Sequence, residues 1–342
     1  TLHLARRRPR PRIRLPEHLA MKTYIPAEIA VAMPAYRAAA ALPRAVESVL
    51  RQTFRDLEVW IVDDGSPDET GAIADGLVRQ DARVRVIHQR NDGCYQARLR
   101  AFRRTRSPWV GTVDADDEAA PTLYERLHAF ATEHNLDVAQ CDTVGSPSRE
   151  PELFLNREEA FRGVIEPKLF RGEGAFVVWD KLYRNRFDFD TYARVPILMF
   201  EDIALNLQLF EHVERVGLLH EGLYLYDINA GSSVRNYREK SFLDFMRVDA
   251  LRREMAPRYG LSPDDVVFDA WVIKNARNHL VLASLAPAPS WGERLANVLR
   301  IVRNDRIRAA AKRVRPAPEL RLAFRFPRLT ILLLRLAKRL RH

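Results

Sequence analysis

The stretch that decides the fold class is Leu57-Glu58-Val59-Trp60-Ile61-Val62-Asp63-Asp64-Gly65-Ser66. Its apolar first part predicts a buried strand over 57–62, and its acidic, glycine-containing end predicts a turn. A helix is expected over 69–80, with Ser66 or Asp68 as its cap. A strand that ends in a polar turn and is followed by a helix is one unit of a parallel α/β sheet.

The same unit recurs on both sides of this stretch. Before it, residues 29–33 predict a strand that Pro34 stops, and apolar residues spaced three and four apart over 42–52 predict a helix. After it, we expect strands over 84–88, 109–113 and 136–140, with helices over about 95–104 and from Pro121 to about 134. Four successive units predict a doubly wound sheet, whose ligand crevice lies at the carboxyl ends of the strands.

The regular alternation ends after Gly145. The pattern then predicts an irregular helix-and-loop region up to a strand over 217–226, two helices within 241–286 and one arginine-rich helix over 291–315. These features predict four parts: a basic, disordered leader (1–22), a sheet domain (23–235), a helical extension (236–290) and a basic amphipathic C-terminal segment (291–342). The sheet domain has two halves, 23–145 and 146–235. Within the leader, we expect residues 1–20 to lie upstream of the true start.

The composition is that of a globular protein of 342 residues, with 47% apolar and 29% charged residues, and it excludes a disordered or collagen-like chain. Two cysteines, Cys94 and Cys141, are too few for a disulfide-stapled fold and indicate a reducing compartment. No apolar run approaches the roughly 20 residues of a membrane-spanning helix, and the start lacks the apolar core of a secretory signal. We therefore expect a cytoplasmic protein.

The net charge of +10 is concentrated at the two ends of the chain. Residues 291–342 carry fifteen Arg or Lys against three acids, and residues 1–22 carry seven against one. Residues 329–340 form an amphipathic segment in which leucines and Ile331 stand beside Arg335, Lys338 and Arg339, which is typical of a helix that lies on anionic lipid. We expect this segment to lie outside the folded body, because it follows Pro316 and Pro318, and to hold the protein on the inner face of the cell membrane. Nucleic acid is the alternative partner for arginine-rich helices, but no nucleic-acid-binding motif is present, so we expect none.

Three acidic clusters end apolar runs: Asp63-Asp64, Asp114-Ala115-Asp116-Asp117 and Glu201-Asp202. Residues i and i+2 of an extended segment point the same way, so Asp114 and Asp116 can face one ligand. Two converging carboxylates repel each other unless a cation joins them, and Mg²⁺ or Mn²⁺ shared with a diphosphate meets that need. A solvated acidic turn is the alternative for the triplet taken alone.

Taken in order, these segments resemble the family 2 glycosyltransferases, inverting enzymes with the GT-A fold. The resemblance covers about residues 28–235 and is carried by the motifs at 30–36, 45–54 and 62–66, by Asn91-Asp92-Gly93 followed by Ala97-Arg98, and by 113–117. Farther on, Trp179-Asp180-Lys181-Leu182-Tyr183-Arg184, Phe200-Glu201-Asp202, Tyr224-Leu225-Tyr226 and Gly231-Ser232-Ser233-Val234 resemble the acceptor half of bacterial polysaccharide-type members. The fold implied is a mixed, mostly parallel α/β sheet with helices on both faces and a C-terminal helical extension.

The resemblance implies that a sugar is transferred from a nucleoside-diphosphate sugar, with a UDP-sugar favoured, to a hydroxyl of a glycan or lipid-linked acceptor. It places Mn²⁺ or Mg²⁺ on Asp116 with Asp114 nearby, the general base on Asp202 with Glu201 as the alternative, and Trp179 and Lys181 on the acceptor side. The donor-binding residues implied are Pro34, Ala35, Tyr36, Asp63, Asp64, Asn91, Gly93, Arg98, Asp114, Ala115 and Asp116.

Three positions depart from the family's pattern. Arg37 and Leu99 stand where the family usually has asparagine, and Cys94 stands where a small residue usually follows Gly93. Arg37 and Leu99 permit a non-catalytic glycan- or nucleotide-binding scaffold, although the intact carboxylates argue against it. A nucleotidyltransferase is the other alternative, but it should carry a glycine-rich phosphate loop after its first strand, and residues 34–42 contain no glycine.

Overall fold

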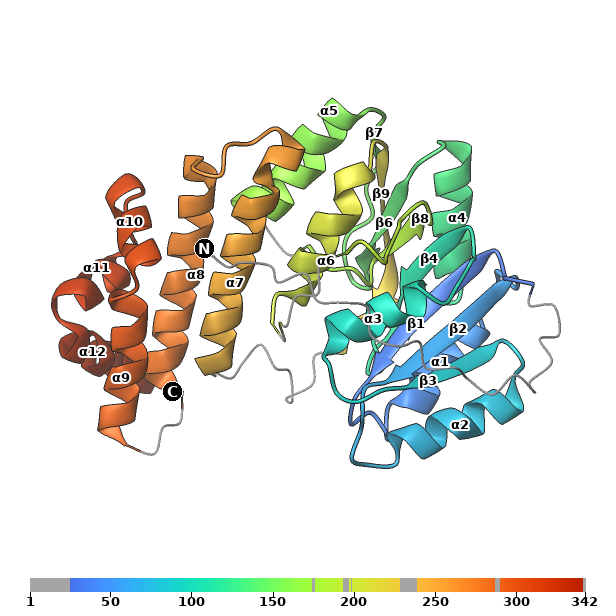
Figure 1. Cartoon of the computed structure of the whole chain (residues 1–342), viewed down its shortest axis with the longest axis horizontal. Coiled ribbons are helices and arrows are strands. Elements are labelled where there is room, and N and C mark those ends of the chain that lie inside the picture. Colours follow the sequence, from blue (N-terminus) through green and yellow to red (C-terminus); the bar gives the residue numbers. More distant parts are fainter. Residues whose placement is uncertain are drawn as a thin grey trace, which may run out of the picture.

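The computed structural model describes residues 25–173, 176–192, 197, 199–227, 239–286 and 290–340. The predicted leader and the Gly231-Ser232-Ser233-Val234 motif lie outside these residues. Figure 1 shows a sheet domain at one end of the molecule and a row of helices at the other.

The sheet begins as a parallel array in the order β3-β2-β1-β4. These strands are β1 (Ile29–Ala35), β2 (Leu57–Asp63), β3 (Val84–His88) and β4 (Trp109–Thr112). It continues through β8 (Lys181–Arg184), β6 (Val138–Thr143) and β9 (Val216–Leu225), with the short β5 (Glu118–Ala119) and β7 (Glu152–Phe154) paired to β9. β8 runs antiparallel to both of its neighbours, and β6 and β9 are parallel. The expected mixed, mostly parallel sheet is confirmed.

Helices cover both faces of the sheet because alternate strand residues point to opposite sides. On one face, Val31 and Met33 of β1 share an apolar cluster with α1 (Leu42–Leu50), α2 (Thr70–Gln80) and α4 (Leu123–Glu133). On the other face, Ala30 and Ala32 share a cluster with α3 (Cys94–Phe102) and α6 (Glu201–Leu209). α1 to α4 lie close to the predicted ranges.

The region after Gly145 is more regular than predicted. It contains α5 (Arg157–Ala160), the π-helical η1 (Phe161–Arg171), and β8, which lies between β4 and β6 in the sheet. β8 is short, and charged residues stand at both of its ends, so neither its length nor its hydropathy identifies it as a central strand. The expectation of an irregular helix-and-loop region was therefore wrong here.

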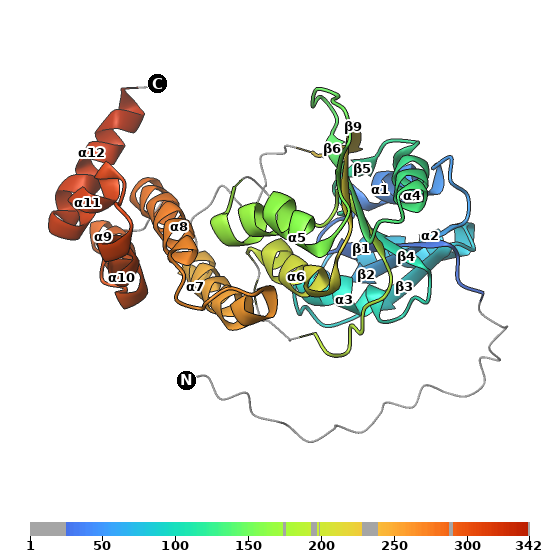
Figure 2. The same cartoon turned by 90° about the horizontal axis from the view of Figure 1, so that it is seen from above.

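The helical extension contains two long helices, α7 (Glu239–Met255) and α8 (Val266–Leu285). The short helix η4 (Ala256–Tyr259) lies in the turn between them. Arg252 of α7 joins this extension to the sheet domain: its Nε donates to the carbonyl oxygen of Leu169 at 2.7 Å, and its guanidinium lies 4.1 Å from the Trp271 ring centroid. In Figure 2, α7 and α8 lie between the sheet domain and the last four helices.

The expected single helix over 291–315 is two helices, α9 (Trp291–Val302) and α10 (Asp305–Arg313). Asn304 separates them, because its side-chain oxygen accepts a hydrogen bond from the backbone N–H of Ile307 and so begins a new helix. Proline residues begin both α11 (Pro318–Arg325) and α12 (Pro327–Arg339).

The last two helices do not lie outside the folded body. Leu320, Ala323 and Ile331 are fully buried, and α11 and α12 pack against α8 and α9. The prolines therefore redirect the chain back onto the helical extension instead of releasing it. Within the described ranges, no helix combines the length and the hydropathy needed to cross a membrane.

Candidate active site

The polar loops after β1, β2 and β3 are tied to one another at the carboxyl edge of the sheet. The carboxylate of Asp64 accepts hydrogen bonds from the backbone N–H groups of Asp92 and Gly93, both at 2.8 Å, and from the Gln89 side chain at 2.6 Å. Gly65 has φ +70°, and a Cβ there would lie 2.7 Å from the backbone nitrogen of Asn91. Asp64 thus holds the loop containing Asn91 and Gly93 against the loop after β2.

Asp63, the last residue of β2, is buried between two polar partners. Its carboxylate accepts a hydrogen bond from the N–H of Ser66 at 3.0 Å and lies 3.0 Å from His88 Nδ1. Burial raises the pKa of Asp63, but the hydrogen bonds from His88 and Ser66 outweigh it and lower the pKa overall. Asp63 is therefore an anionic group paired in the sheet with Ala35, the last residue of β1, and the half-exposed Tyr36 directly follows Ala35.

Arg98 of α3 joins two acidic clusters, 114–117 and 201–202, that the sequence places 84 or more residues apart. Its Nη2 lies 2.6 Å from Asp114 Oδ1, and its Nη1 lies 2.8 Å from Asp202 Oδ1 and 3.8 Å from Glu201 Oε1. The Arg98 side chain is 1% exposed, so it is an internal bridge and not a surface cation. The resemblance places Arg98 among the donor-binding residues; this geometry favours a role in which it holds Asp114 in place, and a direct contact with the donor stays a prediction.

Glu201 and Asp202 form the first turn of α6 on the other side of this bridge. Burial raises the pKa of both carboxyl groups; the charge of Asp202 raises that of Glu201 further, and Arg98 offsets part of the shift in both. A carboxylate with a raised pKa is a stronger proton acceptor than one in water, which is the property a general base needs.

The position of this turn depends on the helical extension. Phe200, which precedes Glu201, has a positive φ of 64°, a conformation that needs support from its surroundings. Its ring lies 6.4 Å from Phe245 of α7 and 6.0 Å from Trp271 of α8, centroid to centroid. The aromatic packing of α7 and α8 therefore fixes where α6 begins.

The Asp114-Ala115-Asp116-Asp117 loop is held from the side of β9. The hydroxyl of Tyr224 donates to Asp117 Oδ2 at 2.8 Å and accepts from the N–H of Asp114 at 3.2 Å. Asp117 is buried, and desolvation raises its pKa to about 7. Ala115 is buried too, so Asp116 is the exposed carboxylate of the loop.

The residues expected on the acceptor side have different surroundings. The Trp179 ring stacks on Tyr224, with centroids 4.1 Å apart, and lies nearly parallel to Tyr226 at 5.6 Å. Lys181, in contrast, is buried in β8, where its ammonium donates to Asp180 and to the carbonyl oxygen of Val177, both at 2.6 Å. The geometry favours a supporting role for Lys181, and its contact with an acceptor stays a prediction.

Cys94 begins α3 directly beside the acidic groups. Burial raises the pKa of its thiol, and the charges of Arg98, Asp114 and Glu201 act on it. It is therefore a neutral, compact side chain next to the ion-paired cluster.

The donor set of the acidic loop fits a divalent cation shared with a substrate. One oxygen of Asp114 is occupied by Arg98, whereas the Asp116 carboxylate has no ion-pair partner among the described residues. Partial desolvation and the nearby charge of Asp114 raise the pKa of Asp116, which a cation would reverse. Across the described part of the chain, no group of three or more His, Cys, Asp or Glu forms a closed metal site. Mg²⁺ is commonly held by one or two carboxylates and completed by substrate phosphates, so the residues suit that kind of site.

Sequence reasoning missed two contributors to this region. The support of Phe200 by Phe245 and Trp271 was not predicted, because aromatic residues in helices 45 or more positions away carry no local signal. The link from Tyr224 to Asp114 and Asp117 was missed as well, although the quoted Tyr224-Leu225-Tyr226 motif places two tyrosines on one face of a strand.

This cluster of acidic side chains lies at the carboxyl edge of a mixed α/β sheet, which is where open α/β sheets bind their ligands. The family model described as Glycosyl transferase family 2 matches residues 30–195. The glycosyltransferase GlyG of Streptococcus pneumoniae is 37% identical over 60% of this chain and 73% of its own length. The chain belongs to glycosyltransferase family 2.

Other relatives agree with this assignment. The uncharacterized glycosyltransferases EpsJ of Bacillus subtilis and YibD of Escherichia coli are 34% and 40% identical, and the matches span 62% and 64% of their lengths. Residues 1–349 of Staphylococcus aureus TarS share the fold, with a TM-score of 0.60 at 18% identity over 90% of this chain and 88% of that one.

Proposed function

We propose that this glycosyltransferase moves a sugar from a nucleoside-diphosphate sugar, with a UDP-sugar as the first candidate, to a hydroxyl of a glycan or lipid-linked acceptor with inversion at the anomeric carbon. The observation that carries the proposal is the Arg98 bridge, which brings the donor-side Asp114 and the paired acids of α6 to one buried guanidinium. TarS has the same fold, and a structure of TarS in complex with UDP-GlcNAc supports a nucleotide-sugar donor.

The donor side of the proposed site is the edge formed by the loops after β1, β2, β3 and β4. The anionic Asp63 and the exposed ring of Tyr36 suit a ribose hydroxyl and a base, respectively. Asp116, with Asp114 nearby, would hold Mn²⁺ or Mg²⁺. When bound, such an ion neutralises the charge that develops on the departing diphosphate.

On the acceptor side, we assign Asp202 as the general base. Its carboxylate takes the proton from the acceptor hydroxyl while that oxygen attacks the anomeric carbon, and the bond from this carbon to the diphosphate breaks with its electron pair. Burial raises the pKa of Asp202, which favours proton uptake, and Arg98 fixes the carboxylate in position. The Trp179 ring, stacked on Tyr224, offers an apolar wall for an acceptor sugar.

A donor screen with UDP-, GDP- and dTDP-sugars and Mn²⁺ tests the reaction, and NMR of the product tests inversion. Asp202→Asn should lower kcat by about 10² to 10⁴ and leave donor affinity unchanged, since a positioned base contributes that much to rate. Glu201→Gln is the matched control, because its carboxylate lies 3.8 Å from Arg98 instead of 2.8 Å, and we expect a smaller loss. If donor affinity falls with Asp202→Asn, Asp202 belongs to the nucleotide site and the assignment is wrong.

A further inference from the structure

A groove of about 450 Å³ opens between α9 and the turn that joins α11 to α12. Its walls combine two chemistries: apolar side chains, including Leu295, Phe326 and Leu329, and the guanidinium groups of Arg303, Arg325 and Arg328. A lining that is both apolar and cationic suits a ligand with a hydrocarbon part and an anionic part.

The three arginines are free to bind an external anion. Each is exposed, and none has an ion-pair partner within the residues that the structure describes. The only acid of α11, Glu319, is already paired with Arg277 of α8 at 2.9 Å. The groove therefore carries uncompensated positive charge.

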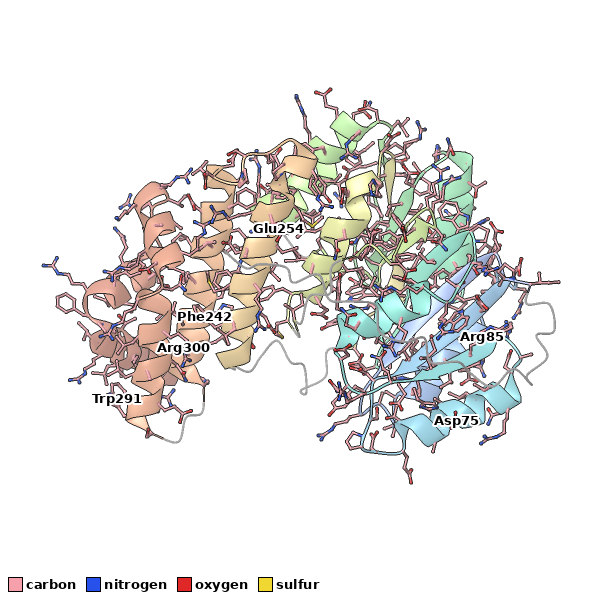
Figure 3. All side chains as sticks on the ribbon, viewed as in Figure 1. Asp75, Arg85, Phe242, Glu254, Trp291 and Arg300 are labelled. Carbon is pink, nitrogen blue, oxygen red and sulfur yellow. The ribbon has the colours of Figure 1, made fainter. Side chains whose placement is uncertain are left out.

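An apolar ridge stands beside this groove. α12 buries Thr330 and Ile331 on its inner side, while its outward leucines Leu332, Leu333 and Leu336 are 56%, 46% and 54% exposed. Together with Leu329 and Phe326 they form a continuous series of large exposed apolar residues, which is unusual on a surface that faces only water. Figure 2 shows α12 at the end of the molecule remote from the sheet domain, and Figure 3 places Trp291 at the start of neighbouring α9.

We propose that this groove binds the phosphate of an anionic phospholipid at a membrane surface, with the arginines on the phosphate and the α12 leucines among the acyl chains. Charge complementarity selects an anion, and the apolar ridge selects a lipid over a free phosphate, which would leave the leucines in water. This binding goes beyond the proposed glycosyl transfer and does not depend on it, because none of these residues belongs to the crevice at the sheet edge.

The test is co-sedimentation of the full chain, without nucleotide sugar, with vesicles of phosphatidylcholine alone or mixed with phosphatidylglycerol. We expect binding only to the mixed vesicles, and about thirtyfold weaker partitioning for Arg325→Gln/Arg328→Gln, since each basic residue at such a surface contributes about fivefold. The matched control is Arg308→Gln/Arg315→Gln, two exposed arginines outside the groove, which should weaken binding much less. Leu332→Ser/Leu336→Ser should weaken it too, and melting curves confirm that each variant is folded.

Equal losses in the two arginine variants would overturn the proposal, because they would show that diffuse charge and not the groove binds the membrane. No binding by the folded wild type to mixed vesicles would overturn it as well. If inorganic phosphate raises the melting temperature of the wild type but not of Arg325→Gln/Arg328→Gln, and vesicles do not bind, the groove serves a soluble anion and the lipid assignment is wrong.

Discussion

The sheet domain and the C-terminal helices use arginine in opposite ways. In the sheet domain, Arg98 is buried and forms ion pairs with Asp114 at 2.6 Å and with Asp202 at 2.8 Å. Its positive charge is therefore neutralised inside the fold, where it holds the two carboxylates in position. In the C-terminal helices, Arg325 and Arg328 are exposed and have no ion-pair partner among the described residues. The net charge of +10 therefore describes neither region. What an arginine does depends on whether its partner is inside the fold.

The first prediction concerns Asp116, an acid that Arg98 does not hold. Asp116→Ala should lower metal-dependent turnover by about 10² to 10³, because a catalytic cation contributes several kcal/mol to the transition state. Asp56→Ala, which removes another exposed carboxylate from the sheet domain, is the control and should be neutral. The measurement is kcat across a Mn²⁺ titration. Full activity of Asp116→Ala, or of the wild type in excess chelator, would show that the site works without a metal.

The second prediction tests the bridge itself. A lysine at position 98 has one ammonium and cannot hold two carboxylates in fixed positions, so Arg98→Lys should lower kcat by about 10- to 100-fold, the value of one to two charged hydrogen bonds. Arg325→Lys makes the same chemical change in the C-terminal helices and should leave kcat unchanged. Both variants are compared by kcat on a soluble acceptor and by melting temperature. If Arg98→Lys and Arg325→Lys lower kcat equally, the buried arginine has no special role in organising the acids, and the two regions do not differ in their use of arginine.

The pH dependence sharpens the role assigned to Arg98. A general base must be ionised to accept a proton, and burial raises the pKa of Asp202. We therefore expect kcat to rise with pH, with an apparent pKa well above the usual aspartate value near 4. Arg98 lowers this pKa, so Arg98→Lys, with a less closely placed cation, should move the rise to higher pH. The measurement is kcat from about pH 4 to pH 9. A rise that stays at the same pH in the variant would mean that the titrating group is not in contact with Arg98.

The smallest effect tests whether the helical extension serves the sheet domain. Phe245 and Phe268 are both fully buried, but only Phe245 contacts Phe200, the residue before Glu201. Each Phe→Leu change should lower the free energy of unfolding by about 1 to 2 kcal/mol. Only Phe245→Leu should also lower kcat, by a few-fold, because it loosens the start of α6. If Phe268→Leu lowers kcat equally, the loss reflects general stability and not support of the acids.

Much of the sheet domain could be predicted because its signals are local. Short apolar runs, and apolar spacings of three and four, identify β1 to β4 and the helices between them without knowledge of any distant contact. The same runs place Asp63, Asp114 and Asp116 at the ends of parallel strands, and therefore at one edge of the sheet. The acidic crevice follows from that topology.

The rest was decided by contacts between residues far apart in the chain. Arg98 and Asp202 are separated by 104 positions, and no periodicity relates them. Lys181 resembles an exposed cation in the sequence, yet the pairing of β8 between β4 and β6 buries it against Asp180. The prolines at 316 and 318 correctly predict a break, but only packing against α8 and α9 determines that the chain turns back onto the body. Up to Gly145, sequence alone thus determined approximately where the elements begin and end, since backbone conformation responds to near neighbours. Tertiary structure determined which charges are buried together, since burial and ion pairing depend on which elements meet in space.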